Sequence, residues 1–383
     1  MMSERKFTLV IHMAQHISNG RGIPKFVLNL FKYTPRDRFS LVLVQSDWIE
    51  YQRVASSALA NVISKCDEVL TYHDRTVKVN FLMKNRFTSF FVYLLLKPLL
   101  MRIDRFLMPK EIKMQMNSAD ILYLTSNYYH PYSRRVKNVV GSCHTFFVTG
   151  NLPSRIQGAL AKCGLIYKFP VVHCFPGYEK YFERKGTTEF TVPLGVDTTL
   201  FFPREQENHN KKRLLFVASL ERGKGFDTIL SLFDAMDKER FELHVVGKGP
   251  MECELNYRES IIYHGALDEL RLSEVYSMCD VFVYPTRGDS FGSVVLEALC
   301  SGLIVITSDL LSGTFDLYER SGYLEYCEDD ADCFMNAIQR ACEREMSLTE
   351  RMVLHELVKS KNDAHKLVID LYNHFLSRLE ATE

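Results

Sequence analysis

The sequence lacks several features that would indicate a specialised class of protein. It has no low-complexity tract, no C-x-x-C pair among its ten cysteines and a single tryptophan in 383 residues. Its 47 basic and 47 acidic residues cancel to a formal net charge of zero. Global charge therefore gives no reason to expect a polyanionic partner, and we predict no binding to nucleic acid. Several of the scattered cysteines lie inside apolar runs, as Cys279 and Cys300 do, which is typical of reduced, buried thiols.

Long hydrophobic runs and a recognisable signal peptide are also missing. The longest apolar stretch extends from Phe90 to Leu96 and continues past Lys97 and Pro98 to Met101. That stretch is too short and too interrupted to span a bilayer. Together these absences favour a cytoplasmic setting.

A region from Lys65 to Lys113 combines basic and apolar residues. It has ten Lys and Arg against five Asp and Glu, interleaved with Phe, Leu, Met and Tyr. The pattern fits an amphipathic surface that lies on an anionic membrane, and it fits equally a core helix pair with a solvated basic face. A peripheral position on the cytoplasmic face of a membrane is therefore one of two expectations.

A pattern of apolar strands separated by helices occurs twice along the chain. In the first half, strands are expected at residues 7–14, 39–47, 119–126, 138–145 and 169–175, with a helix from about Ile23. After a polar run at residues 204–213 the pattern restarts, with strands at 213–219, 241–249, 260–266, 280–286 and 303–309. This alternation predicts the α/β class, with two doubly wound Rossmann-like domains built on parallel sheets.

We expect an N-terminal domain over residues 1–200, a C-terminal domain over 201–362 and a last helix over 363–383. The apolar stripe of that helix, Leu367, Leu371, Phe375 and Leu379, can pack on either domain, including back on the N-terminal one. Two such domains would present the carboxyl ends of their strands across a cleft. Ligands in open α/β sheets bind beyond those ends, so the candidate residues lie in the loops that follow each strand.

The most informative loop contains the segment "RGDSFGSVVLEALCSG". A helix is expected to begin near Ser293, and its free first amides together with its dipole form an anion site suited to a diphosphate. Gly292 lets the backbone come close to a ligand. Asp289 can accept hydrogen bonds from sugar hydroxyls, and a partly exposed Glu297 one turn into the helix can accept two from a ribose diol. Taken singly, each acid also has an ordinary explanation, as a loop acid or a polar helix position.

Several segments together resemble a known family. "DSFGSVVLEALCSG" resembles the E-x(7)-E signature of retaining glycosyltransferases with the GT-B fold, in glycosyltransferase family four. The segments "VPLGVDTTLFFP", "ASLERGKGFDTIL", "LHVVGKGP" and "IIYHGALDELRLSEVYSMCDVFVYPT" resemble other motifs of that family. The resemblance covers roughly residues 190–345, whereas the N-terminal half matches only through its glycine loop and "GSCHT".

The resemblance implies an enzyme that moves a hexose, with retention, from a nucleotide-diphosphate sugar to a hydroxyl acceptor. The acceptor would be a glycan or a lipid-linked precursor, as in polysaccharide or lipopolysaccharide biosynthesis at the cell surface. The C-terminal domain would hold the donor and the N-terminal domain the acceptor. The resemblance implies no cofactor and no requirement for a metal.

The resemblance also assigns roles to residues. Lys224, Asp289 and His144 would be the catalytic residues: Lys224 would contact the donor diphosphate, Asp289 would hold the donor sugar and His144 would be the family's cleft-facing histidine. The family arginine is replaced by Ser219, and Arg222 is near enough in sequence to substitute. Asp289 is one methylene shorter than the usual Glu, which leaves the sugar open. The donor-binding set comprises Gly20, Gly22, Arg222, Lys224, His264, Gly265, Asp289, Phe291, Gly292, Ser293, Val294 and Glu297.

Three other interpretations stay open. Asp47 ends the second strand, as a ribose-binding acid does in dinucleotide enzymes, but "NGRGIPK" has Lys25 where the third glycine should be. The segment "DDAD" can be a metal site, although a helix cap by Asp332 is a simpler explanation. The departures at Ser219 and Asp289 also suit a catalytically silent domain that binds a sugar nucleotide or a partner.

Overall fold

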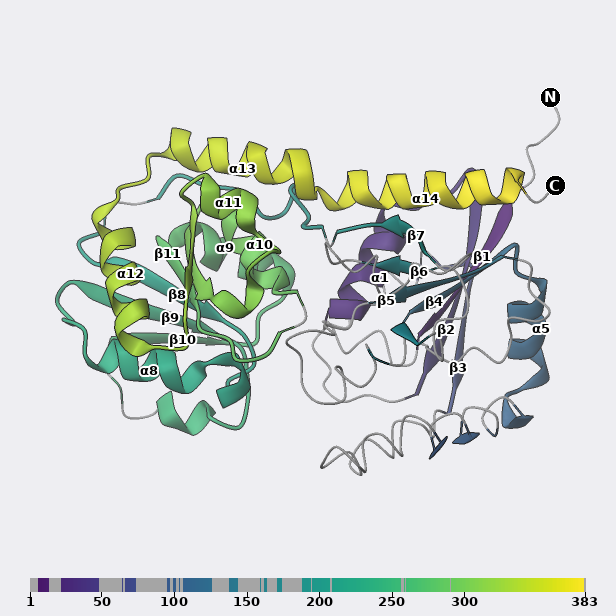
Figure 1. The fold of residues 1–383 in the computed structure, drawn as a ribbon, viewed down its shortest axis with the longest axis horizontal. Helices are drawn as coiled ribbons and strands as arrows, with labels where there is room; N and C mark the ends of the chain where they lie inside the picture. Colours follow the sequence, from purple (N-terminus) through teal and green to yellow (C-terminus); the bar gives the residue numbers. More distant parts are fainter. Residues whose placement is uncertain are drawn as a thin grey trace. The chain divides into compact units, whose positions relative to one another are not determined.

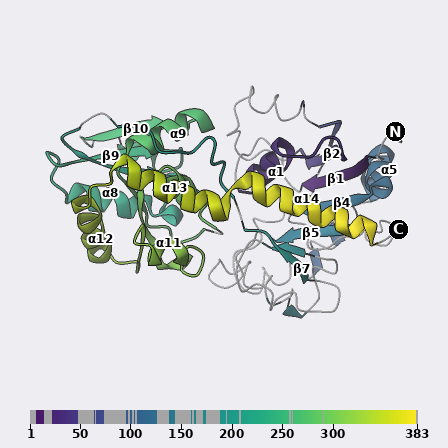
Figure 2. The same ribbon diagram turned by 90° about the horizontal axis from the view of Figure 1, so that it is seen from above.

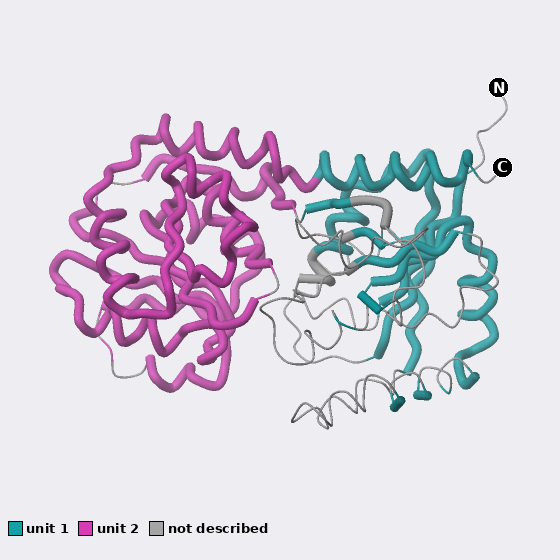
Figure 3. Tube along the Cα trace, in the orientation of Figure 1, with its two compact units in different colours: residues 1–193, 365–383 teal, residues 194–364 magenta. Residues whose placement is uncertain are grey.

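The structure is a computed structural model that divides into two compact units. It describes residues 6–13, 22–47, 64, 66–73, 95–96, 99–100, 103, 106–125, 138–143, 159, 162–163, 171–173, 188–193, 195–206, 209–255, 258, 260–289 and 291–381. Unit 1 comprises residues 1–193 and 365–383, and unit 2 comprises residues 194–364 (Figure 3). The last helix therefore belongs to the same unit as the first half of the chain.

Unit 1 is built on a sheet of seven parallel strands in the order β3-β2-β1-β4-β5-β6-β7 (Figure 1). The strands are β1 (Phe7–Met13), β2 (Phe39–Ser46), β3 (Glu68–Tyr72), β4 (Ile121–Thr125), β5 (Val139–Cys143), β6 (Val171–His173) and β7 (Thr188–Thr191). The described helices are α1 (Gly22–Lys32), α5 (Lys110–Ser118) and α14 (Ala364–Glu380). The central strands β1 and β4 are mostly apolar and largely buried, as expected of a parallel sheet with both faces covered.

The last helix, α14, runs along unit 1 (Figure 2), and it packs there through aromatic residues. The ring of Tyr372 lies 4.9 Å from that of Phe39 in β2, and the ring of Phe375 lies 5.6 Å from that of Tyr123 in β4. The Tyr372 hydroxyl also shares a hydrogen bond of 2.8 Å with Thr34, just after α1. The buried stripe of α14 thus completes the hydrophobic core of unit 1.

Unit 2 has six parallel strands in the order β10-β9-β8-β11-β12-β13. Its strands are β8 (Lys212–Val217), β9 (Phe241–Val246), β10 (Ile261–Gly265), β11 (Val281–Tyr284), β12 (Ile304–Ser308) and β13 (Leu324–Cys327). Its helices are η4 (Arg222–Lys224), α8 (Phe226–Asp234), η5 (Glu252–Leu255), α9 (Glu269–Met278), α10 (Ser293–Cys300), η6 (Asp309–Leu311), α11 (Asp316–Arg320), α12 (Ala331–Glu343) and α13 (Leu348–Asn362). Helices α8 and α12 contact each other, and α10 contacts α9 and α13, so helices cover both faces of the sheet (Figure 1).

Two doubly wound parallel sheets confirm the predicted α/β class and the two Rossmann-like domains. The strands predicted in both halves are present, because continuous apolar runs between polar loops have few alternatives to a buried parallel strand. Within the described residues, no helix combines the length and the hydropathy needed to cross a membrane.

Candidate active site

The strand order of unit 2 reverses between β8 and β11. From β8 the sheet continues through β9 to β10, and from β11 it continues through β12 to β13. The loops that follow two such neighbouring strands lead away to opposite sides and leave a crevice at their carboxyl ends. Lys224 follows β8 and Asp289 follows β11, so this topology brings together two residues that are far apart in the chain.

Lys224 and Asp289 form an ion pair at this crevice. The Lys224 Nζ lies 3.0 Å from Asp289 Oδ2, and both side chains are about one-fifth exposed, at 22% and 23%. The same Nζ donates a hydrogen bond of 2.8 Å to the carbonyl of Gly288. One cation and one anion are thus held next to each other where a ligand can reach both.

A glycine allows this approach. Gly225, directly after η4, has φ +74°, and a Cβ there would lie 1.9 Å from the carbonyl oxygen of Pro285. Any side chain would therefore push η4 away from the loop that follows β11. Gly225 is the second glycine of the "ERGKGF" segment, and its role in the structure is the close contact of these two loops.

Further hydrogen bonds orient Asp289. Its Oδ2 accepts from the Tyr284 hydroxyl at 2.5 Å, and its Oδ1 accepts from the backbone N–H of Phe291 at 3.3 Å. Burial acts to raise the pKa of Asp289, but the charge of Lys224 and the hydrogen bonds from Tyr284, Lys224 and Phe291 lower it below its ordinary value. Asp289 is therefore an ionised carboxylate at neutral pH.

Tyr284 was not predicted as a site residue, because it lies inside the apolar run of β11. Burial, followed by the charge of Asp289, raises the pKa of the Tyr284 phenol well above its ordinary value. The phenol therefore keeps its proton and acts as a hydrogen-bond donor to the carboxylate. The sequence signal that could have identified it is a tyrosine at the end of an apolar strand, shortly before an acidic residue in the following loop.

The N-terminus of α10 begins directly after this pair. Gly292 is its N-cap with φ +73°, and a Cβ there would lie 2.9 Å from Leu311 Cδ1. Phe291 is buried against Phe315, with ring centroids 5.5 Å apart. Packing therefore fixes the position from which the first amides of the helix, at Ser293 and beyond, can bind an anion.

Glu297 is buried, and the expectation that it is partly exposed was wrong. Only 3% of the residue is accessible, because α10 is enclosed by its contacts with α9 and α13. The Tyr276 hydroxyl of α9 donates to the Val294 carbonyl at 3.2 Å. Burial, followed by the Glu297 carboxylate, raises the pKa of the Tyr276 phenol. Glu297 thus belongs to the interior of unit 2.

His264 and Gly265 end β10, at the same edge of the sheet. The His264 ring stacks on that of His244 with centroids 5.2 Å apart, and His264 Nε2 lies 3.0 Å from His244 Nδ1. The second nitrogen of His244 lies 3.2 Å from Glu242 Oε1. Burial, followed by His244, lowers the pKa of His264, so its ring is neutral at pH 7. One ring nitrogen of His264 is thus occupied inside the protein.

The remaining predicted residues have varied surroundings. Arg222 is exposed on η4, next to Lys224. Gly22 begins α1, whereas Gly20 and His144 lie outside the described residues. Asp47, the acid of the dinucleotide alternative, lies 2.6 Å from His73 in a half-exposed pair.

The "DDAD" segment starts α12, but the capping residue is not the predicted one. Asp330 is the N-cap, and its carboxylate accepts from the Cys333 amide at 2.9 Å, whereas Asp332 lies inside the first turn. The helix begins two residues earlier than expected because Ala331 already has helical geometry. Asp329 pairs with Arg287 at 3.2 Å. No cluster of three or more His, Cys, Asp or Glu side chains that could hold a metal ion occurs in the described part of the chain.

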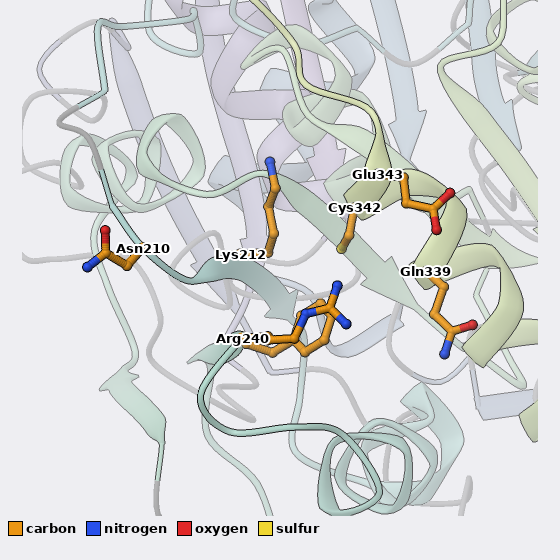
Figure 4. Close-up of a pocket in the computed structure, with 7 residues that line it drawn as sticks. Asn210, Lys212, Arg240, Gln339, Cys342 and Glu343 are labelled. Atoms are coloured by element: carbon orange, nitrogen blue, oxygen red, sulfur yellow. The ribbon is translucent and has the colours of Figure 1, made fainter.

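A cavity of about 430 Å³ lies at the other end of the strands, where β8 and β9 begin (Figure 4). It is lined by Asn210, Lys212, Arg240, Phe241, Gln339, Cys342 and Glu343. None of these residues belongs to the predicted donor set. Because ligands in open α/β sheets bind beyond the carboxyl ends, this cavity is not the candidate active site.

Known proteins resemble part of the chain in sequence. Residues 211–344 match the family described as "Glycosyl transferases group 1". The GDP-mannose-dependent alpha-(1-6)-phosphatidylinositol dimannoside mannosyltransferase of Mycobacterium tuberculosis is 28% identical over 158 residues, 37% of this chain and 41% of the relative. The chain spans between 24% and 34% of the length of the first curated relatives that it matches.

Solved structures resemble the whole chain in fold. Sucrose-phosphate synthase from Thermosynechococcus elongatus has a TM-score of 0.70 at 16% identity, covering 99% of this chain and 100% of that one. WaaG, a glycosyltransferase involved in lipopolysaccharide biosynthesis, has a TM-score of 0.60 at 13% identity, covering 96% and 99%. The chain thus has the GT-B fold, and the segment that matches the group 1 family, residues 211–344, includes Lys224, Asp289 and α10.

Proposed function

We propose that this protein is a retaining glycosyltransferase that uses a nucleoside diphosphate sugar. The observation that supports this most directly is the Lys224–Asp289 pair beside the N-terminus of α10, at the switch point of the unit that matches the group 1 family. A cation and a helix N-terminus suit the diphosphate, and an ionised carboxylate suits the sugar hydroxyls. A bound donor would contact both residues of the ion pair, Lys224 through its diphosphate and Asp289 through its sugar hydroxyls.

In the proposed reaction the acceptor oxygen bonds to the anomeric carbon on the face from which the diphosphate leaves. The bond between that carbon and the phosphate oxygen breaks, and its electron pair goes to the diphosphate. The acceptor proton passes to the same diphosphate. Lys224, the amides of α10 and the exposed Arg222 would stabilise the growing negative charge, which is electrostatic catalysis of the oxyanion-hole type.

Changing Lys224 to Ala should lower kcat about 100- to 1000-fold, as the loss of one oxyanion donor does, with a smaller change in KM. The reason is that charge on the diphosphate grows in the transition state. Turnover of labelled donor measures both parameters. Lys359→Ala, which removes an exposed lysine of α13, should leave both unchanged. An effect of Lys224→Ala on KM alone would mean that the side chain binds only the ground state.

Glu297 is proposed to hold the ribose of the donor, from the first turns of α10. Because it is buried, Glu297→Gln is a better probe than Ala, since it keeps the shape of the side chain. Losing a charged hydrogen bond costs about 1.5–3 kcal/mol, so affinity should fall roughly 10- to 100-fold. Calorimetric titration with UDP, GDP and ADP measures this, with the exposed Glu343→Gln as control. Unchanged affinity in a folded Glu297→Gln variant would contradict the ribose role.

We also propose that turnover needs no metal. Asp329 is bound to Arg287 and Asp330 caps α12, so two of the three "DDAD" carboxylates already have structural partners. Activity should therefore persist in excess EDTA, measured as donor turnover over time. Complete loss that added Mg²⁺ or Mn²⁺ restores would make that segment a metal site again.

A lipid-linked acceptor is proposed from the surface of unit 1. Large apolar side chains are exposed there: Leu95, Leu99, Ile103, Phe106, Leu107 and Met114. The basic residues Lys110 and Lys113 of α5 lie among them in sequence, and Lys113 donates to the Phe106 carbonyl at 2.9 Å. Exposed apolar residues beside cations suit an anionic membrane surface. The other basic residues of this region, Lys97, Arg102 and Arg105 among them, lie outside the described residues.

The protein should therefore sediment with anionic phosphatidylglycerol vesicles at low salt, less with neutral ones, and be released as the salt concentration rises. Phe106→Asp with Leu107→Asp should reduce that binding several-fold, because both side chains would otherwise enter the lipid. Val353→Asp, at an exposed apolar position of α13, should have no effect. If the wild-type protein ignores anionic vesicles at low salt, the lipid-linked acceptor loses its support.

A further inference from the structure

Arg287 lies two residues before Asp289 and joins three separate segments of unit 2. Its Nη1 lies 2.8 Å from Asp227 Oδ1, and its Nη2 donates to the Thr228 hydroxyl at 2.6 Å, both at the start of α8. Its Nε lies 3.2 Å from Asp329 Oδ2, in the loop before α12. The guanidinium is therefore engaged on every nitrogen by the protein itself.

Arg287 also binds the backbone of η4. Its Nη1 donates to the Arg222 carbonyl at 3.1 Å, and its own backbone N–H donates to the Gly223 carbonyl at 3.1 Å. The next residue is Lys224, whose Nζ reaches the Gly288 carbonyl on the other side of Arg287. The position of Lys224 relative to Asp289 thus depends on contacts that Arg287 makes.

We propose that Arg287 is a positioning residue for the transferase reaction. It holds η4 against the loop after β11, so that Lys224 and Asp289 meet the donor together, and it does not touch the donor. This inference rests on the function proposed above. Two carboxylates and a hydroxyl occupy its guanidinium, so it does not replace the family arginine lost at Ser219.

The chemistry of the contacts requires arginine. Its planar fork donates from three nitrogens in fixed directions, whereas a lysine ammonium is one flexible point donor that cannot span Asp227, Asp329 and the Arg222 carbonyl. The side chain is 37% exposed, so each ion pair alone stabilises the fold only modestly. Its effect on geometry is larger, because a displacement of about 1 Å at a reacting centre can cost roughly 100-fold in rate.

The first test needs no substrate. The amides of Lys224 and Gly225 donate to Glu221 and Arg222 carbonyls at 3.0 Å, so their hydrogen exchange reports whether η4 is held. In Arg287→Ala, exchange over residues 221–226 should be at least several-fold faster than in wild type, and Arg287→Lys should restore it only in part. Unchanged exchange would contradict the proposal that Arg287 holds η4 in place, whether or not the protein transfers sugars.

A matched control is an arginine that binds the other end of α8. Arg258 contacts Asp234, the last residue of that helix, at 3.0, 3.1 and 3.2 Å and is also partly exposed. Arg258→Ala should leave exchange over residues 221–226 and donor turnover within about twofold of wild type. An equal effect of both variants would show that the faster exchange comes from a general loosening of α8 and not from losing the contacts of Arg287 with η4.

The second test uses turnover. Arg287→Ala should lower kcat about 100-fold with little change in KM, while thermal denaturation shows a folded protein. Asp227→Asn and Asp329→Asn should each give part of that loss, and combining either with Arg287→Ala should add little. A rise in KM alone would mean that Arg287 contacts the donor. If the wild type turns over no donor, the proposed function is wrong, whereas the exchange measurement still tests whether Arg287 holds η4 in place.

Discussion

The attraction between Lys224 and Asp289 at the switch point of unit 2 is the interaction on which the candidate site depends. The two residues are brought together by the reversal of strand order at β8 and β11, because both loops open at the same edge of the sheet. Tyr284 and the Phe291 amide donate hydrogen bonds to the carboxylate. The pair keeps two opposite charges partly exposed without leaving either uncompensated.

Glycines make this arrangement possible by allowing backbone segments to touch. At Gly225, η4 lies against Pro285, and at Gly247 a Cβ would lie 1.8 Å from the Ala218 carbonyl, so the loop after β9 lies on the end of β8. Both have positive φ, a conformation that other residues adopt only with strain. The motif glycines of unit 2 therefore serve loop packing as well as any ligand.

A partly buried polar network links three strands of the unit 2 sheet. Arg213 in β8 lies 2.7 Å from Glu242 in β9, which lies 3.2 Å from His244, and the latter contacts His264 at the end of β10. Burial lowers the pKa of His244 and outweighs the opposing effect of Glu242. A neutral histidine can then link the carboxylate to His264 through its two ring nitrogens.

The fold class and most strands followed from the chain alone, because buried parallel strands are continuous apolar runs that local composition reveals. The residues around the start of α10 could also be predicted, because Gly292, Asp289 and Glu297 follow one another along a single loop and helix.

Three features could not be predicted from the sequence and became clear only in the folded structure. Burial of Glu297 depends on α9 and α13, which enclose α10 from other parts of the sequence. The cap of α12 depends on which aspartate has extended backbone geometry, and that residue is Asp330. The role of Arg287 depends on partners that are distant in sequence, Asp227 and Asp329. The role of Tyr284 could not be predicted because the residue lies in an apolar run. Local patterns decide which elements form, whereas long-range contacts decide which polar groups those elements bring within hydrogen-bonding distance.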